Sequence, residues 1–175
     1  MQLEIDPRFP IGRYEPQPFS DEQKEQWLAD IKFLPNAIEN AVHQLDEQQL
    51  QTPYREGGWT VHQLVHHVAD SHVNAYVRFR LALTEAVPTI KPYDETRWGE
   101  LADAKTADVE LSLRLLESLH ARWVLLLRSM MDADFERTYF HPEHQRAFRL
   151  DEVLAMYAHH GRHHCGQVAW LKGRL

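Results

Sequence analysis

The 175-residue chain has only one cysteine, Cys165. A single cysteine cannot form a disulfide within the chain, and it is too few for a metal site built from thiolates. A disulfide framework and a thiolate-rich metal site are therefore both excluded. We expect Cys165 to be a small buried residue.

Long apolar runs and clusters of basic residues are also missing. No apolar run approaches the roughly 18 residues needed to span a bilayer, and the opening MQLEIDPRFPIGRY lacks the basic and apolar regions of a secretory signal. The 26 Asp and Glu residues outnumber the 19 Lys and Arg residues, which gives a net charge of −7 with neutral histidines. This balance disfavours binding to nucleic-acid phosphates. We expect a cytoplasmic protein that binds neither membranes nor nucleic acids.

Four segments do contain the 3.6-residue hydrophobic period of amphipathic helices. The predicted helices cover residues 21–45, 61–83, 106–131 and 150–175. Capping boxes precede the first two, at Ser20 with Gln23 and at Thr60 with Gln63, and Asp151 is a plausible N-cap for the last. With 43% apolar residues in 175, the chain suits one well-buried core, so we expect a single domain over residues 1–175.

The connections add three features. Residues 1–19 combine four prolines with aromatic side chains, which predicts an extended arm over the core. Residues 86–105 form a long loop that we expect to cover a functional site. Residues 135–150 are expected to form two short strands around a turn, with His141 and His144 exposed in that turn. The predicted fold is all-α, a four-helix bundle with a small β-hairpin before the last helix and an extended N-terminal arm.

The last predicted helix contains four of the twelve histidines. Measured from its apolar stripe, His164 lies roughly 40° and His160 roughly 80° away, so both point inward, whereas His159 and His163 should face solvent or a partner. His160 and His164 are four residues apart, which allows their imidazoles to converge on one point. This pattern is typical of half a metal site, and zinc in an open site takes a third protein ligand.

The second predicted helix offers four candidates for that third ligand, His62, His66, His67 and His72. Helical periodicity favours His72, which lies near the middle of the apolar stripe, whereas His67 lies on a polar strip. A polar strip on a central helix can line a site instead of facing solvent, so the choice stays open. His120 shares the stripe of the third predicted helix and is expected to be a core residue.

Three blocks of sequence resemble the DinB-like superfamily, and within it the YfiT branch of metal-dependent hydrolases. The blocks are YREGGWTVHQLVHHVADSH at 54–72, RFRLALTEAVPTIKPYDETRW at 78–98 and LDEVLAMYAHHGRHHCGQV at 150–168. The resemblance implies a four-helix bundle that binds one divalent metal, usually zinc with nickel as another possibility, through one histidine of the second helix and two of the last. The family's first ligand precedes Val-Ala-Asp-Ser-His and matches His67, with His72 and His66 as alternatives, while the other two match His160 and His164. It also implies a homodimer.

The resemblance favours a metal-dependent hydrolase acting on an unknown small substrate. Its general base is not evident, because Gly-Arg-His separates His160 from His164 and the glutamate of the H-E-x-x-H motif is missing. Asp70, Glu152 and His163 are candidate bases. A second hypothesis is a zinc-dependent thiol S-transferase that conjugates a low-molecular-weight thiol to an electrophile. A third is a non-enzymatic metal-binding stress module.

Overall fold

The structure, a computed structural model, describes residues 5–175, so the first four residues of the predicted arm lie outside it. Its elements confirm the predicted fold of four long helices with a two-stranded hairpin before the last. The elements in chain order are α1 (Asp21–Val42), α2 (Glu47–Leu50), α3 (Val61–Thr84), α4 (Glu95–Gly99), α5 (Ala102–Thr106), α6 (Val109–Ser129), α7 (Asp132–Phe135), β1 (Thr138–His141), β2 (Arg146–Arg149) and α8 (Leu150–Lys172). None of the helices in residues 5–175 is long and apolar enough to cross a membrane.

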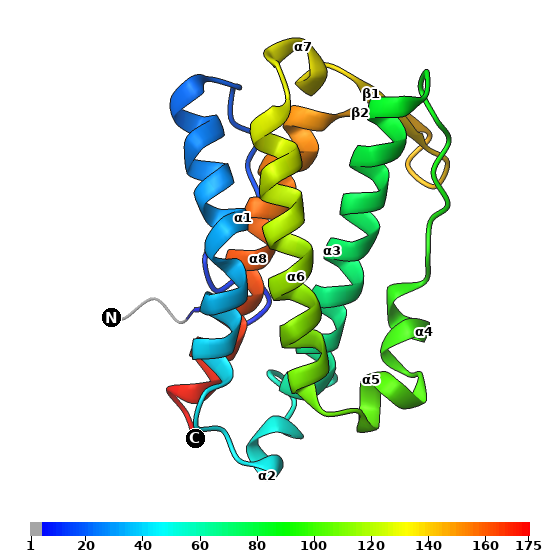
Figure 1. The fold of residues 1–175 in the computed structure, drawn as a ribbon. Helices are drawn as coiled ribbons and strands as arrows, with labels where there is room; N and C mark the ends of the chain where they lie inside the picture. Colours follow the sequence, from blue (N-terminus) through cyan, green and yellow to red (C-terminus); the bar gives the residue numbers. More distant parts are fainter. Residues whose placement is uncertain (1–4) are drawn as a thin grey trace.

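The four long helices form a closed ring of contacts. α1 packs against α8 and α6, and α3 packs against the same two helices. In Figure 1, α1 and α8 run downward while α3 and α6 run upward. Neighbouring helices in the ring are therefore parallel in two of the four pairs, α1 with α8 and α3 with α6, which differs from a simple up-and-down bundle.

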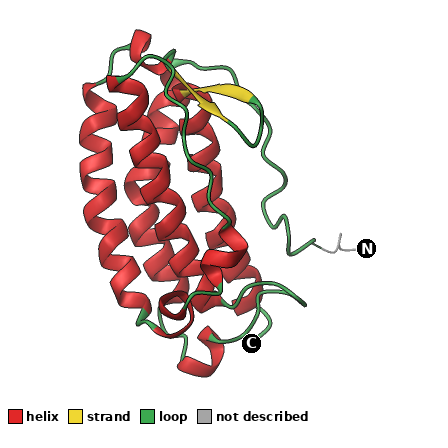
Figure 2. Ribbon diagram, turned by 90° about the vertical axis from the view of Figure 1, so that its right-hand side faces the viewer, coloured by secondary structure: helices red, strands yellow, loops and turns green. Residues whose placement is uncertain are grey.

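The parallel arrangement of α3 and α6 explains the long connection between them. The chain leaves the top of α3 and must return along the whole bundle before α6 can start in the same direction (Figure 1). The predicted loop is this return segment, and it contains the short helices α4 and α5, both of which contact α3. Figure 2 shows it descending over one face of the helices.

The predicted helix caps are confirmed in full at α3, in part at α1 and not at α8. The Thr60 hydroxyl accepts from the Gln63 N–H, and the Gln63 side chain accepts from the Thr60 N–H, which confirms that capping box. Ser20 accepts from the Gln23 N–H at 3.2 Å. The prediction of Asp151 as N-cap was wrong: α8 starts at Leu150, and Asp151 lies in its first turn, where it binds Arg149 at 2.8 Å. A carboxylate there still interacts favourably with the helix dipole.

The core histidine His120 forms a hydrogen bond with a backbone carbonyl that a proline leaves without a helical partner. His120 of α6 is 1% exposed, as predicted for a core residue, and its Nδ1 donates to the Ile31 carbonyl of α1 at 2.5 Å. That carbonyl lacks its helical partner because the residue four positions later is Pro35, which has no N–H. A side chain of a neighbouring helix thus satisfies a polar group that proline leaves free.

The hairpin pairs β1 with β2 in antiparallel register, Tyr139 opposite Phe148. The prediction that both of its histidines are exposed was wrong for His141, which is part of β1 and buried, whereas His144 is exposed. The prediction failed because it treated His141 as a turn residue, whereas one face of the hairpin packs onto the bundle. The N-terminal arm crosses the outer side of α8, where Pro10 and Ile11 lie over Gly166.

Close packing of α1 and α8 depends on Gly161. A Cβ atom added there would lie 2.7 Å from Leu34 Cδ2 and 2.8 Å from Cδ1. We therefore expect Gly161→Val to reduce the free energy of unfolding by about 2 kcal/mol, because an overpacked core forces side chains out of their preferred rotamers. Urea denaturation measures this. In the Leu34→Ala background the same substitution should cost little, and strictly additive losses would contradict the predicted contact.

Candidate metal centre

Three imidazoles from two helices meet at one point. His67 comes from α3, and His160 and His164 come from successive turns of α8. His160 Nε2 lies 3.3 Å from His67 Nε2 and 3.1 Å from His164 Nε2, and the ligand atoms of all three lie within 4.8 Å of one another. A tetrahedral ion bound at about 2.0–2.1 Å separates two ligand nitrogens by about 3.3 Å, so the spacing fits such an ion.

Surrounding groups orient the two α8 histidines with their Nε2 atoms toward this point. The His164 Nδ1–H donates to Gln167 Oε1 at 2.8 Å, and His160 Nδ1 shares a hydrogen bond with His72 Nε2 at 3.2 Å. The amide oxygen of Gln167 can only accept, so the bond to it leaves the Nε2 lone pair of His164 free for a metal. A proton on His160 Nδ1, donated to His72, would free the Nε2 lone pair of His160 in the same way. His67 is held differently, since its ring lies against the indole of Trp59 with centroids 4.3 Å apart.

Burial keeps the three histidines neutral. Removal of water lowers the pKa of His67 to about 4. The pKa values of His160 and His164 lie well below their ordinary range, first through burial and then through the neighbouring histidines. Only a neutral imidazole has a lone pair to give to a metal, so the cluster is in its ligating form at neutral pH.

The other candidates for the first ligand lie elsewhere. His72, which periodicity favoured, is 0% exposed in the core and reaches the cluster only through its bond to His160. His66 faces α6, where it bonds to the Ser112 hydroxyl at 2.7 Å. Periodicity identifies the most buried position on a helix, whereas a metal ligand has to border a cavity. The structure groups His67, not His72 or His66, with the α8 pair.

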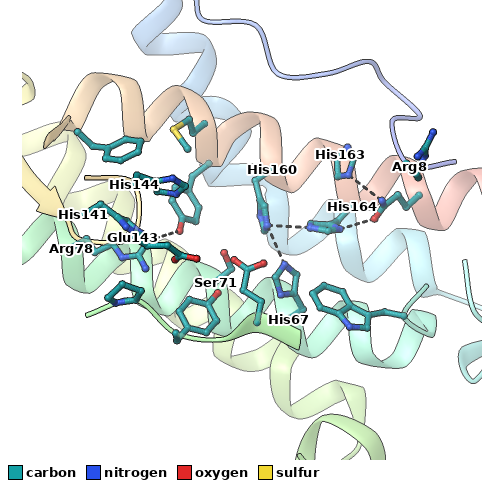
Figure 3. Close-up of a pocket in the computed structure, with 18 of the residues that line it drawn as sticks. Arg8, His67, Ser71, Arg78, His141, Glu143, His144, His160, His163 and His164 are labelled. Atoms are coloured by element: carbon teal, nitrogen blue, oxygen red, sulfur yellow. Dashed lines mark hydrogen bonds between the residues drawn. The ribbon is translucent and has the colours of Figure 1, made fainter. Parts of the chain in front are cut away.

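The cluster lies in the wall of a cavity of about 560 Å³. Figure 3 shows His67, His160 and His164 converging in this cavity, with Arg78, His141 and Glu143 further along it. Aromatic side chains provide much of the remaining wall: Phe9, Tyr54, Trp59, Tyr93, Tyr139, Phe148 and Tyr157. The predicted loop lines the cavity through Pro92, Tyr93 and Glu95, in line with its expected role.

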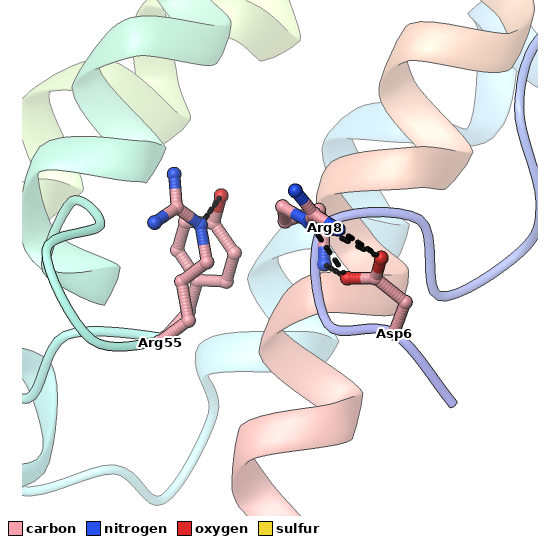
Figure 4. Close-up of polar contacts among 4 residues, drawn as sticks. Asp6, Arg8 and Arg55 are labelled. Carbon is pink, nitrogen blue, oxygen red and sulfur yellow. Dashed lines mark hydrogen bonds and ion pairs between the residues drawn. The ribbon is translucent and has the colours of Figure 1, made fainter. Parts of the chain in front are cut away.

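Two arginines lie at the edge of the cavity near the arm. Arg8 of the arm forms an ion pair with Asp6 at 2.8 Å, and Arg55 bonds to the Tyr54 hydroxyl at 3.1 Å. Figure 4 shows the two guanidinium groups on opposite sides of the gap between the arm and the segment before α3. Both residues line the cavity, but Asp6 neutralises Arg8, whereas Arg55 has no carboxylate partner among the described residues.

The arm also changes the surroundings of the two outward histidines of α8. Both were expected to face solvent or a partner, but each is partly buried. Tyr14 packs against His159 with ring centroids 5.6 Å apart, and Phe9 lies 6.4 Å from His163. The N-terminal arm of the same chain therefore covers His159 and His163, which were expected to face solvent or a partner.

Of the three candidate bases, only His163 lines the cavity. Asp70 lies outside it, and burial together with Asp103 raises its pKa to about 6. Glu152 is also outside and forms an ion pair with Arg146.

Sequence reasoning missed Glu95, one of two carboxylates that line the cavity; the other is Glu143. Although the Glu95 side chain is exposed, partial removal of water by the surrounding protein raises its pKa, and Arg78 opposes this shift. The signal that could have identified Glu95 is its position in the long loop, inside the second block of resemblance. A loop residue has no periodicity that would assign it to a face.

Comparison with known proteins agrees with this architecture. The model of the DinB superfamily matches residues 30–168. The chain is 46% identical over 168 residues to "Putative metal-dependent hydrolase YfiT" of Bacillus subtilis, which covers 95% of this chain and 94% of that protein. It is 50% identical over 171 residues to a "Putative metal-dependent hydrolase" of Bacillus cereus, with 97% of this chain and 98% of the relative covered.

A solved structure of YfiT matches the fold closely. It superposes with a TM-score of 0.93 at 46% identity and covers 96% of this chain and 97% of YfiT. YfiT is described there as "a probable metal-dependent hydrolase with an unusual four-helix bundle topology". The chain therefore belongs to the DinB superfamily, as a close homologue of YfiT.

Proposed function

We propose that this protein is a metal-dependent hydrolase in which His67, His160 and His164 bind one divalent ion, zinc in the native protein, beside a small-molecule substrate. The observation that supports the proposal is the position of three neutral imidazoles, with nitrogens 3.1 and 3.3 Å apart, in the wall of a cavity of about 560 Å³. The names of the relatives in Bacillus agree with it.

The donor set favours a catalytic over a structural ion. Structural zinc sites have four protein ligands, whereas the cluster found among residues 5–175 has three and borders a cavity. His67, His160 and His164 would hold a divalent ion without neutralising it, and such an ion would supply Lewis acidity that lowers the pKa of water to about 7. This favours the hydrolase over the non-enzymatic stress module.

The residues of the chain have separate tasks in this mechanism. Gln167 and His72 hold the α8 imidazoles in orientation through their Nδ1 atoms. The aromatic walls exclude bulk water from the substrate, which strengthens electrostatic interactions within the cavity. Glu95, one of the two carboxylates that line the cavity, would accept the proton of the attacking water as general base, and partial removal of water by the surrounding protein raises its pKa.

A thiol S-transferase is the second candidate. Arg55 at the entrance favours it, because a guanidinium without a carboxylate partner among the described residues would attract an anionic low-molecular-weight thiol. Such a thiol would have to come from solution, because burial raises the pKa of Cys165 to about 11 and keeps it protonated.

Hydrolysis of p-nitrophenyl esters and anilides by zinc-loaded protein tests the proposal. We expect turnover without any thiol, a loss of at least about 100-fold after chelation, and recovery when zinc is added back. Turnover that requires an added thiol, with formation of a thioether product, would support the transferase instead. Equal rates before and after chelation would contradict both.

We further propose that the protein acts in the cytoplasm as a homodimer. α6 presents the exposed side chains of Leu111, Leu115 and Leu125 on one face, with Ser118 and Arg122 between the second and the third. An exposed apolar stripe of this kind is typical of a surface between subunits.

A further inference from the structure

The most deeply buried arginine of the cavity wall, Arg78, has no matching anion among the described residues. Arg78 of α3 lines the cavity and is 9% exposed, yet no carboxylate in residues 5–175 lies within ion-pair distance of its guanidinium. Its side-chain partners in the described part of the chain are neutral tyrosine hydroxyls, Tyr157 at 3.5 Å and Tyr139. A guanidinium has five N–H donors, and a buried charge without a partner is unfavourable.

Polar atoms without partners also occur on neighbouring walls. The Tyr93 hydroxyl and His141 Nδ1 are buried and have no hydrogen-bond partner among the described residues. Both residues line the cavity, and the charge of Arg78 acts on both. His141 has its pKa lowered by burial, then by His144 and Arg78, so it is neutral and able to donate from Nδ1. The arginine therefore lies among further potential donors for an acceptor group.

Helix geometry places Arg78 on the same face of α3 as His67 of the metal centre. Arg78 follows His67 by eleven residues, which is three turns, so both project from the same face of α3 with roughly 16 Å of helix rise between their Cα atoms. Side chains on a helix lean toward its N-terminus, which brings the arginine toward the histidines. In Figure 3 both lie along one cavity, with Ser71 between them.

The acidic side chains of the cavity form no ion pair with Arg78, although Glu95 lies close enough for the arginine to oppose the rise in its pKa. Glu95 and Glu143 line the same cavity, but neither reaches ion-pair distance of Arg78. A ligand carboxylate would fit where these side chains leave the guanidinium free, because two of its N–H groups can donate in parallel to the two oxygens.

We propose that Arg78 binds a carboxylate of the substrate, so that the hydrolase acts on a small acid whose scissile ester or amide lies at the histidine cluster several bonds from that carboxylate. The aromatic walls between the two sites would enclose the apolar middle of such a molecule. This inference rests on the proposed function, because it assigns the reacting end to the metal centre. The inference adds to the proposed function the class of substrate, a small carboxylic acid, and the residue that binds its carboxylate, Arg78.

Bifunctional probes test the inference. The probes are hydroxamates that bind the metal at one end and carry a carboxylate at the other, with spacers of two to five methylenes, each compared with the primary amide of the same length. Calorimetry on zinc-loaded protein should show that, at one spacer length, the carboxylate binds about 10-fold to 100-fold more tightly than its amide. Arg78→Gln should abolish this preference without changing the affinity for the amide, and Arg78→Lys should retain part of it.

Arg80→Gln provides the matched control, because Arg80 is exposed on the same helix and does not line the cavity. It should keep the full preference. Equal affinity of wild-type protein for carboxylate and amide at every length, or a preference that survives in Arg78→Gln, would overturn the proposal.

The metal-free protein separates this proposal from the proposed function. Glutarate should raise the thermal unfolding midpoint of metal-free wild-type protein more than glutaramide does, and Arg78→Gln should remove the difference. If no hydroxamate binds but glutarate still stabilises the protein, the metal function fails while the carboxylate site stands. If the uncharged hydroxamates bind and neither assay shows a preference for carboxylate, the substrate class is wrong and the metal function stands.

Discussion

Replacing His160 with alanine should reduce bound metal from about one ion per chain to nearly none. His160 is the middle member of the cluster, since its Nε2 is the atom next to both His67 and His164. Its loss leaves two ligands, which are too few to hold zinc in competition with water. Mass spectrometry of the metal content of tag-free, dialysed protein measures the effect, with circular dichroism to verify that the helices persist.

The neighbouring histidines supply controls for this experiment. His67→Ala and His164→Ala should also lose the ion, whereas His66→Ala should keep it because His66 bonds to Ser112 on the other side of α3. His72→Ala should keep the ion with about 10-fold to 100-fold weaker affinity, since it removes only the partner of His160 Nδ1. Metal retained in His67→Ala and lost in His72→Ala would mean that the core histidine is the ligand after all.

Glu95→Gln should lower kcat by about 100-fold or more while leaving the metal content unchanged. A general base contributes about 10²–10⁴ to the rate, and glutamine has nearly the same shape but cannot accept a proton. The acid limb of the pH profile should change as well. The base has to be ionised, and burial raises the pKa of Glu95, so activity in the wild type should fall as the pH drops through this raised value.

Glu143→Gln is the matched control, because Glu143 is the other carboxylate of the cavity and loses the same charge. It should stay within about threefold of the wild type, since the proposed mechanism assigns the proton transfer to Glu95 and no role to Glu143. A similar loss in both variants would indicate a general electrostatic effect instead of proton transfer. An unchanged kcat in Glu95→Gln would leave His163, the remaining candidate base that lines the cavity, to be tested in the same way.

Features that depend on local sequence were predictable. The helical repeat placed His160 and His164 on the inner flank of α8 without knowledge of the fold, because four residues advance about one turn. The Thr60 and Gln63 capping box depends on four consecutive residues and was correct for the same reason. His120 was correctly assigned to the core, although its bond to the carbonyl freed by Pro35 depends on the neighbouring helix.

Features that depend on contacts between distant segments were not predictable in this way. Periodicity favoured His72, the most buried histidine of α3, over His67, which borders the cavity. The family resemblance favoured His67 because it contains information about the cavity that one helix lacks. His141 was expected in an exposed turn, but the hairpin buries it against the bundle.

The sequence by itself determined the four amphipathic helices, the order of the elements and the converging pair on α8, since each follows from the spacing of residues within one segment. Only the tertiary structure decided which histidine of α3 completes the cluster and which charged side chains share its cavity. The parallel packing of α3 with α6 makes the chain return along the bundle, and this return brings Glu95 beside the cavity wall to which α3 contributes Arg78. No local pattern contains that information, because it arises from the way the helices bury their apolar faces against one another.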